Sequence, residues 1–185
     1  MRENAAARVG SSGWASPEWA ESLRAPRYLV TVRRDEHQDA YTATYRSGLR
    51  RVLDAASPSV VRRLERVRDA ATVRTDGVTI DVFPDQEGDG TFAVWARFRG
   101  ADSFALDRLV GDDRQLFTVV WAEHGWEPAV PERPGAWSTT RFEDVLFATV
   151  VEWIDPLIPR DAVHLRWEVT GPDGTQDCHP VGPGR

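Results

Sequence analysis

The stretch "VTIDVFPDQEGDGTFAVWARF", Val78 to Phe98, alternates apolar and polar residues on both sides of a short acidic loop. The apolar set, one residue in every two, is Val78, Ile80 and Val82 before the loop and Phe92, Val94, Ala96 and Phe98 after it. A period of two places alternate side chains on one face of a β-strand. The stretch therefore predicts two strands, each with one buried face, that are joined as a hairpin.

The loop itself, "PDQEGDGTF", begins like a calcium-binding loop. Asp85, Glu87 and Asp89 stand at alternate positions and Gly90 follows them. A calcium loop of the EF-hand type also needs a bidentate glutamate at its twelfth position and helices on both sides. The twelfth position here is Ala96, on the apolar side of a predicted strand. We predict a tight turn and no metal site, with weak surface binding of a divalent ion as the alternative, because Gly and Asp tolerate the backbone angles of turns.

Helical spacing dominates the chain before this stretch. Apolar residues recur at intervals of three and four between residues 35 and 55, which predicts an amphipathic helix there. Ser57 and Pro58 then have the residue types of a helix N-cap and first turn, and an apolar face follows up to Val67. We expect the two helices to pack as an antiparallel helical hairpin, preceded by a short strand at "YLVTV", residues 28–32.

Further strands and one clear helix follow the hairpin. The segments "QLFTVVWAE", "HLRWEVT" and "QDCHPV" are rich in β-formers, and the last two are joined by the turn signal "GPDGT". Residues 142–157 have the strongest amphipathic pattern, after a capping box formed by Thr140 and Glu143.

The fold class is therefore α+β. The prediction comprises the N-terminal helical hairpin, a mainly antiparallel sheet of 4–6 strands, the 142–157 helix packed on that sheet, and a closing C-terminal β-hairpin. Residues 1–25, rich in Ala, Ser and Gly, are expected to be a disordered tail, and residues 26–185 a single domain.

The composition excludes several kinds of chemistry. All 23 basic residues among the 185 are arginine, so sites that need a lysine, such as the phosphate-binding loop or a Schiff base, are excluded. A single cysteine, Cys178, allows no internal disulfide and favours the cytoplasm. We expect no secretory signal, because no apolar stretch follows the first charged residues, and no apolar run reaches the ~18 residues that a membrane span needs. The motifs GxSxG, GxGxxG, HExxH and CxxC do not occur, so we predict no catalytic residues and no cofactor.

Charge is unevenly distributed along the chain. Residues 24–74 carry twelve arginines and six acids, whereas residues 76–185 carry nine arginines and twenty acids. Such asymmetry indicates either a charged partner or two halves that pair within one fold, and we favour pairing. We do not expect a nucleic-acid partner, because Glu65 and Asp69 interrupt the arginine-rich helix face.

The tryptophans indicate a candidate binding surface. Trp153 and Trp167 fall on apolar faces and are predicted to lie in the core. Trp95 lies on the polar side of its strand, and Trp126 and Trp137 lie in segments rich in Pro and Gly, so we expect these three tryptophans to be partly exposed. The predicted binding residues are Trp95, Trp126, Trp137, Glu123 and Glu127. Exposed tryptophans beside acidic groups are typical of protein-binding surfaces.

Two segments, "DVFPDQEGDGTFAVWARF" and "VVEWIDPLIP", resemble small actinobacterial proteins of an uncharacterised family of unknown function. The resemblance spans about Tyr41 to Pro159 and carries no residue roles. It implies a bacterial source with GC-rich DNA, which agrees with the absence of lysine.

Two functions remain open on the sequence. The first is a non-catalytic cytoplasmic protein-binding domain of the immunity or accessory type, with a protein partner. The alternative is a small enzyme or ligand-binding domain with an acidic, aromatic-lined pocket between the sheet and the 142–157 helix, where Asp81, Glu123 and Glu127 would supply the polar groups.

Overall fold

The computed structural model describes residues 27–84, 90–162, 164–171 and 178–183, with side chains from residue 39 onward. The chain divides into two compact units, Met1–Gln38 and Asp39–Arg185. The predicted tail, residues 1–25, lies outside the described residues. The unit Asp39–Arg185 contains every described strand and every described side chain.

Helices are interspersed with mainly antiparallel strands, which confirms the predicted α+β fold class. The elements are α1 (Arg27–Ala70), β1 (Thr75–Pro84), β2 (Phe92–Gly100), α2 (Ser103–Val110), the 3-10 helix η2 (Gly111–Arg114), β3 (Gln115–Thr118), β4 (Val120–Ala122), β5 (Gly125–Glu127), α3 (Thr139–Ile154), the 3-10 helix η3 (Asp155–Leu157), β6 (Arg166–Thr170) and β7 (His179–Val181).

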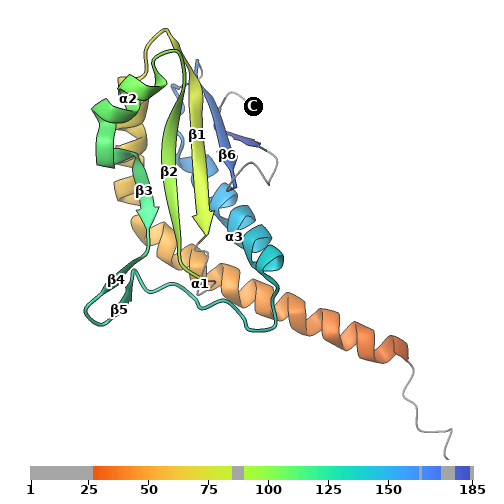
Figure 1. Cartoon of the computed structure of the whole chain (residues 1–185). Helices are drawn as coiled ribbons and strands as arrows, with labels where there is room; N and C mark the ends of the chain where they lie inside the picture. Colours follow the sequence, from red (N-terminus) through yellow and green to blue (C-terminus); the bar gives the residue numbers. More distant parts are fainter. Residues whose placement is uncertain (1–26, 85–89, 163, 172–177, 184–185) are drawn as a thin grey trace, which may run out of the picture. The chain divides into compact units, whose positions relative to one another are not determined.

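The main sheet has five strands in the order β3-β2-β1-β6-β7 (Figure 1). β1 and β2 pair antiparallel from Val78↔Phe98 to Pro84↔Phe92, as their alternating pattern predicts. The pairs β2–β3 and β6–β7 are also antiparallel, so the closing hairpin is confirmed. Among the described strands, β1–β6 is the only parallel pair. The intervening segment, which contains α3, carries the chain back to the end of the sheet where β1 begins, so β6 runs in the same direction as β1.

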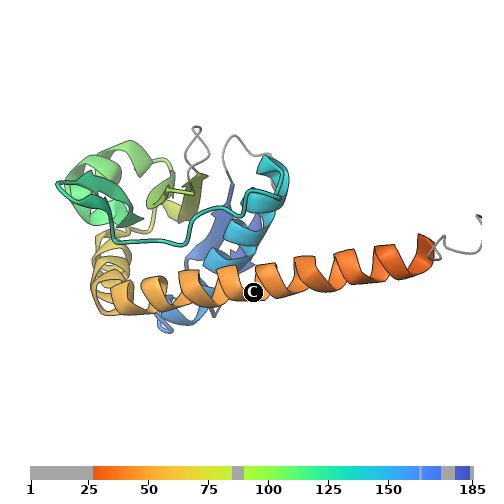
Figure 2. The ribbon, with the colours of Figure 1, turned by 90° about the horizontal axis from the view of Figure 1, so that it is seen from below.

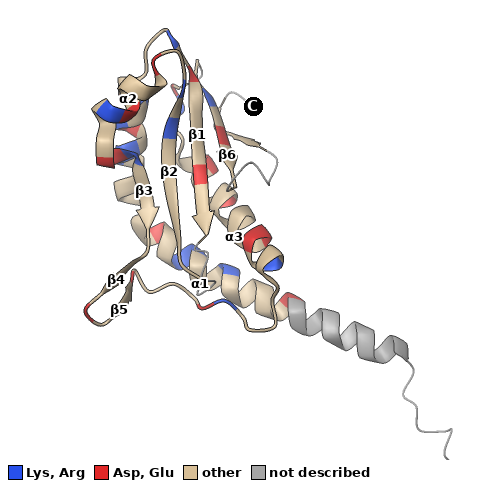
Figure 3. Ribbon diagram, viewed as in Figure 1, with Lys and Arg blue, Asp and Glu red and all other residues tan. Residues whose placement is uncertain are grey.

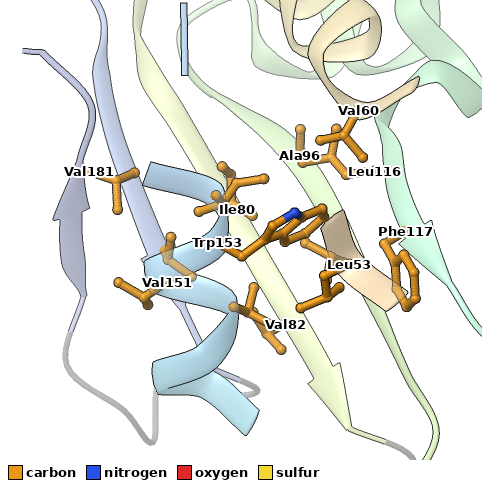
Figure 4. Close-up of a cluster of buried hydrophobic side chains, with 14 of the residues drawn as sticks. Leu53, Val60, Ile80, Val82, Ala96, Leu116, Phe117, Val151, Trp153 and Val181 are labelled. Atoms are coloured by element: carbon orange, nitrogen blue, oxygen red, sulfur yellow. The ribbon is translucent and has the colours of Figure 1, made fainter. Parts of the chain in front are cut away.

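α1 and α3 pack on one face of the sheet and enclose the core (Figures 1 and 2). Figure 4 shows Trp153 of α3 between Ile80 and Val82 of β1 on one side and Leu53 of α1 on the other. All four side chains are at most 1% exposed. They pack α3 directly on the sheet, in the region where the alternative function expects its pocket.

The predicted helical hairpin is wrong, because its two helices are one continuous helix, α1, which passes through Ser57 and Pro58 without interruption. Figures 1 and 2 show α1 changing direction sharply in its second half, as a proline inside a helix can cause. The Ser57 hydroxyl donates to the carbonyl of Leu53, 3.2 Å away, and also accepts a hydrogen bond from the Trp153 indole at 2.9 Å. Ser57 therefore lies inside a bent helix, where it links α1 to α3, and it is not an N-cap.

Three local predictions need correction. Residues 28–32, predicted as a strand, belong to α1. The N-cap of α3 is Ser138, whose side chain accepts a hydrogen bond from the Arg141 amide, so the cap lies two residues before the predicted Thr140. The short helix α2 lies in a segment for which the sequence analysis predicts no element, and of its residues only Leu106 is buried.

Gly90 adopts the positive φ that the turn prediction requires, with φ +95°. The acids Asp85, Glu87 and Asp89 lie outside the described residues. A Cβ at Gly90 would also lie 3.1 Å from the backbone nitrogen of Arg133. Strain and crowding therefore act together at this position.

We predict that Gly90→Val lowers the free energy of unfolding by at least ~1 kcal/mol. Urea denaturation monitored by circular dichroism measures this change. Gly135→Val is the matched control, because Gly135 has no positive φ and a Cβ there would have no neighbour within 4 Å. Equal losses in the two variants would contradict the strain argument.

Candidate functional site

A small hairpin separate from the main sheet brings together several of the predicted binding residues. β4 and β5 pair antiparallel, with Val120 opposite Glu127 and Trp121 opposite Trp126. Glu123 and His124 form the two-residue turn, and Gly125 follows with φ +131°. A two-residue loop followed by a glycine of positive φ fits the geometry of tight β-hairpins. Figure 1 shows this hairpin beyond the end of β3, at the lower left.

The two tryptophans of the hairpin contact each other and are exposed to solvent. Their ring centroids are 5.1 Å apart and the rings meet edge to face at 83°. Trp121 is 69% exposed, Val120 51% and Trp126 36%. Adjacent residues in a strand point to opposite faces, so Val120 and Trp121 expose apolar surface on both sides of the hairpin. We call these three residues the hairpin surface.

Acidic side chains flank the hairpin surface. Glu123 at the turn and Glu127 at the end of β5 are both exposed. The structure thus groups three predicted residues, Trp126, Glu123 and Glu127, in one hairpin. Sequence reasoning missed Trp121, because it stood inside the single long strand predicted for residues 115–123. The available signal was a pair of tryptophans, Trp121 and Trp126, with the turn glycine Gly125 between them, because such a pair can meet across a tight hairpin.

Trp137, predicted to be partly exposed, is instead 4% exposed and belongs to the core. Its ring packs edge-on against Tyr45 of α1, with centroids 5.2 Å apart, and Arg133 donates to its carbonyl at 2.6 Å. The segment before α3 therefore folds back onto α1, although its Pro and Gly content favours an exposed loop. Burial also raises the pKa of the Tyr45 phenol well above its usual range.

Trp95 lies apart from the hairpin, on the face of β1, β2 and β6 that points away from the core. We call this the open face. Strand register arranges its residues in three rows, Trp95–Asp81–Thr170, Arg97–Thr79–Glu168 and Arg99–Gly77–Arg166. Trp95 is half-buried there, as its position on the polar side of β2 predicts.

Two arginine–carboxylate pairs lie on the open face, and Figure 3 colours the basic and acidic positions of its strands. Arg97 donates to Asp81 through Nε at 2.9 Å and Nη2 at 3.0 Å, and these hydrogen bonds raise the pKa of Arg97. Arg99 of β2 pairs with Glu168 of β6, two strands away. The contact is diagonal, and Gly77, which is opposite Arg99 in the register, has no side chain to obstruct it.

Three ion pairs join the arginine-rich first part of the chain to its acidic later part, in agreement with the pairing that we favoured. Arginines of α1 pair with acids of the later segments: Arg46 with Glu152, Arg66 with Asp113, and Arg68 with Asp161. Arg68 holds the pKa of Asp161 below its usual range through the hydrogen bond between them. The arginine-rich face of α1 is therefore at least partly neutralised within the fold.

The described part of the chain offers neither a metal-binding cluster nor a membrane-spanning helix. Among those residues, no three His, Cys, Asp or Glu side chains gather closely enough to hold a metal ion. None of the described helices combines the length and the apolar character needed to span a membrane.

Comparison with known proteins identifies a family. No curated protein sequence matches this chain, and no solved structure matches it. The model of a family of unknown function, DUF6389, matches residues 40–185. The match begins one residue after the compact unit Asp39–Arg185 begins, and it includes the main sheet, α3 and the β4–β5 hairpin. The expectation of an uncharacterised family is confirmed: the protein belongs to the DUF6389 family.

Proposed function

We propose that this protein is a non-catalytic protein-binding domain of the immunity or accessory type, active in the cytoplasm, whose contact surface is the β4–β5 hairpin. The single observation that carries this proposal is the tryptophan pair, Trp121 and Trp126, exposed together on a hairpin outside the main sheet.

Exposed tryptophan surface is energetically unfavourable in water and favourable in an interface. A tryptophan side chain presents about 150–250 Å² of area, and each Å² of apolar area removed from water contributes about 25 cal/mol. The pair also steadies the hairpin itself, but such cross-strand contacts contribute only ~0.2–1 kcal/mol. Because Trp121 stays 69% exposed in spite of this contact, most of its apolar area is available to a partner.

The acids beside the hairpin surface favour a particular partner chemistry. Glu123 and Glu127 are exposed next to the tryptophans, and the chain has a formal net charge of -6. Complementary charge at the rim of an interface speeds association and disfavours partners of like charge. We therefore infer a protein partner with an apolar patch that is surrounded by arginine or lysine. Two copies docked hairpin to hairpin would bring their glutamates together, which disfavours self-association through this surface.

The test is loss of partner binding in the variant Trp121→Ser/Trp126→Ser. The full chain serves as bait in cell extract, captured proteins are identified by mass spectrometry, and the candidate partner is purified for calorimetry. We predict that the double substitution weakens its binding at least thirtyfold, about 2 kcal/mol, as expected for interface tryptophans. Phe104→Ser is the matched control, because Phe104 of α2 is 74% exposed but lies outside the hairpin; its effect should stay below threefold.

A second arm tests the acidic rim. Glu123→Gln/Glu127→Gln should slow association and reduce its dependence on salt, with a smaller effect on dissociation. Circular dichroism establishes that each variant is folded, and Trp121→Ser alone replaces the double variant if the hairpin pair proves necessary for folding. A purified partner that binds the folded tryptophan variants with unchanged affinity would overturn the proposal.

A further inference from the structure

The open face of the sheet contains a groove that is independent of the hairpin. Its volume is about 720 Å³, within the range of small-molecule sites. Its lining includes Thr79 and Asp81 of β1, Trp95, Arg97 and Arg99 of β2, and Arg114 of η2. None of the hairpin surface residues lines it.

The floor of the groove is polar and well shielded. Thr79 is 5% exposed and Asp81 6% exposed, although they face away from the core. The side chains of neighbouring strands rise around them, and Arg97 covers Asp81 through its two hydrogen bonds. Shielding of this kind distinguishes a concave site from a flat sheet surface.

The groove has a surplus of positive charge at one end. Arg97 and Asp81 neutralise each other, whereas Arg99 and Arg166 both pair with Glu168. Two guanidinium groups therefore share one carboxylate. Arg99 lines the groove, whereas Arg166 lies beside it, across Gly77 from Arg99 in the strand register, with a side-chain exposure of 71%. A local positive charge in a protein of net charge -6 favours a negatively charged ligand at this end.

The other end of the groove offers an aromatic surface. Trp95 lines the groove and the guanidinium of Arg114 lies 5.9 Å from its ring centroid. Phe83, 45% exposed, also lines this end. The row that contains Arg99 is four residues along the strand from the row that contains Trp95, about 13 Å between backbones. The Arg99 side chain spans part of this distance, because its guanidinium pairs with Glu168 in the row between them. Trp95 and Arg99 line the same groove, so one small molecule in it can contact both.

We propose that this groove binds a small organic anion that carries a planar aromatic ring. The ring packs on Trp95, and its carboxylate or phosphate group pairs with Arg99 and Arg166. The inference does not rest on the proposed protein-binding function, because the two surfaces have no residue in common.

The experiment uses the full chain labelled with nitrogen-15 and follows its indole N–H signals by NMR, with the Trp95 signal assigned from its absence in Trp95→Phe. The probes are 1-naphthyl phosphate, 1-naphthoate, neutral 1-naphthol and inorganic phosphate. We predict that at least one aromatic anion shifts the Trp95 signal and binds at least tenfold more tightly than 1-naphthol or inorganic phosphate. The stronger of the two anions identifies the headgroup as phosphate or carboxylate.

Two variants locate the anion. Arg99→Gln and Arg166→Gln should each weaken binding of the aromatic anion about tenfold, and Arg62→Gln, an exposed arginine on α1, should leave it unchanged. Arg166→Gln keeps the Arg99–Glu168 pair and so remains informative if Arg99→Gln does not fold. The variant Trp121→Ser/Trp126→Ser should bind the anion normally, which separates this result from the proposed function.

Three results would overturn the proposal. One is 1-naphthol binding as tightly as the aromatic anions, which would show that charge is not recognised. Another is a response confined to the Trp121 and Trp126 signals, which would place the probe on the hairpin surface. The third is the absence of any shift at Trp95 with all four probes at millimolar concentration.

Discussion

Replacing Trp153 by alanine is expected to lower the free energy of unfolding by about 4 kcal/mol, the upper range for a single core substitution. Trp153 is 0% exposed, and it is the largest of the side chains labelled in Figure 4. Its ring packs edge-on against Phe117 of β3, with centroids 6.2 Å apart. Removing the indole therefore removes contacts that join α3 to α1 and to the sheet.

The cost is large because the surrounding elements cannot close the resulting cavity. β1 is held on both sides by β2 and β6, and the bent part of α1 is fixed against the same core. The substitution also removes the 2.9 Å hydrogen bond from the indole to Ser57 in α1. An unfilled cavity and the loss of this hydrogen bond add to the lost transfer free energy.

Urea denaturation followed by circular dichroism measures the loss, with Trp121→Ala as the matched control. Trp121 has the same side chain but is 69% exposed, so its removal should cost less than about 1 kcal/mol. Losses of similar size in the two variants would show that burial does not decide the contribution of these tryptophans.

The sequence identifies Trp153 and the two central strands because each lies in a segment with an unbroken period. Trp153 recurs with the apolar face of its helix, and residues 78–98 alternate without a break on both sides of the loop. Such a period is a property of the local sequence, so it can be recognised without knowledge of the rest of the fold. The α+β class and the closing hairpin follow from such segments.

Long-range contacts decide the features that the sequence did not predict. Trp137 is buried because Tyr45, 92 positions earlier in the chain, packs against it. Pro58 stays inside α1, where the indole of Trp153 bonds to the neighbouring Ser57, and no local pattern reveals that contact. The parallel pairing of β1 and β6 depends likewise on the path of the intervening chain.

The candidate sites show the same division. Composition indicated that tryptophans and acids near Gly125 form a surface, and three of the five predicted residues do meet there. The contribution of Trp121 required the register of the hairpin, which places it opposite Trp126. The groove required the register of three strands, because Arg99 and Glu168 are far apart in sequence and pair across β1.

The second large effect is expected at the Arg97–Asp81 pair, and it should be asymmetric. The side chain of Asp81 is 9% exposed, whereas that of Arg97 is 56% exposed. Arg97→Ala leaves a buried carboxylate without its partner, and we expect a loss of about 2–3 kcal/mol in the free energy of unfolding. This lies below the usual cost of breaking a fully buried pair because water reaches the arginine side.

Asp81→Ala should cost less, about 1 kcal/mol, because the freed guanidinium of Arg97 can turn into water and regain hydration. The double variant Arg97→Ala/Asp81→Ala should then be about as stable as Asp81→Ala alone, since no buried charge remains unpaired. Urea denaturation of the three variants gives the coupling energy. If Asp81→Ala costs as much as Arg97→Ala, the carboxylate stabilises the open face through other contacts, and the unpaired-charge argument fails. If the asymmetry is found, the polar floor of the groove depends on Arg97 for its stability, because Arg97 is the residue that compensates the buried charge.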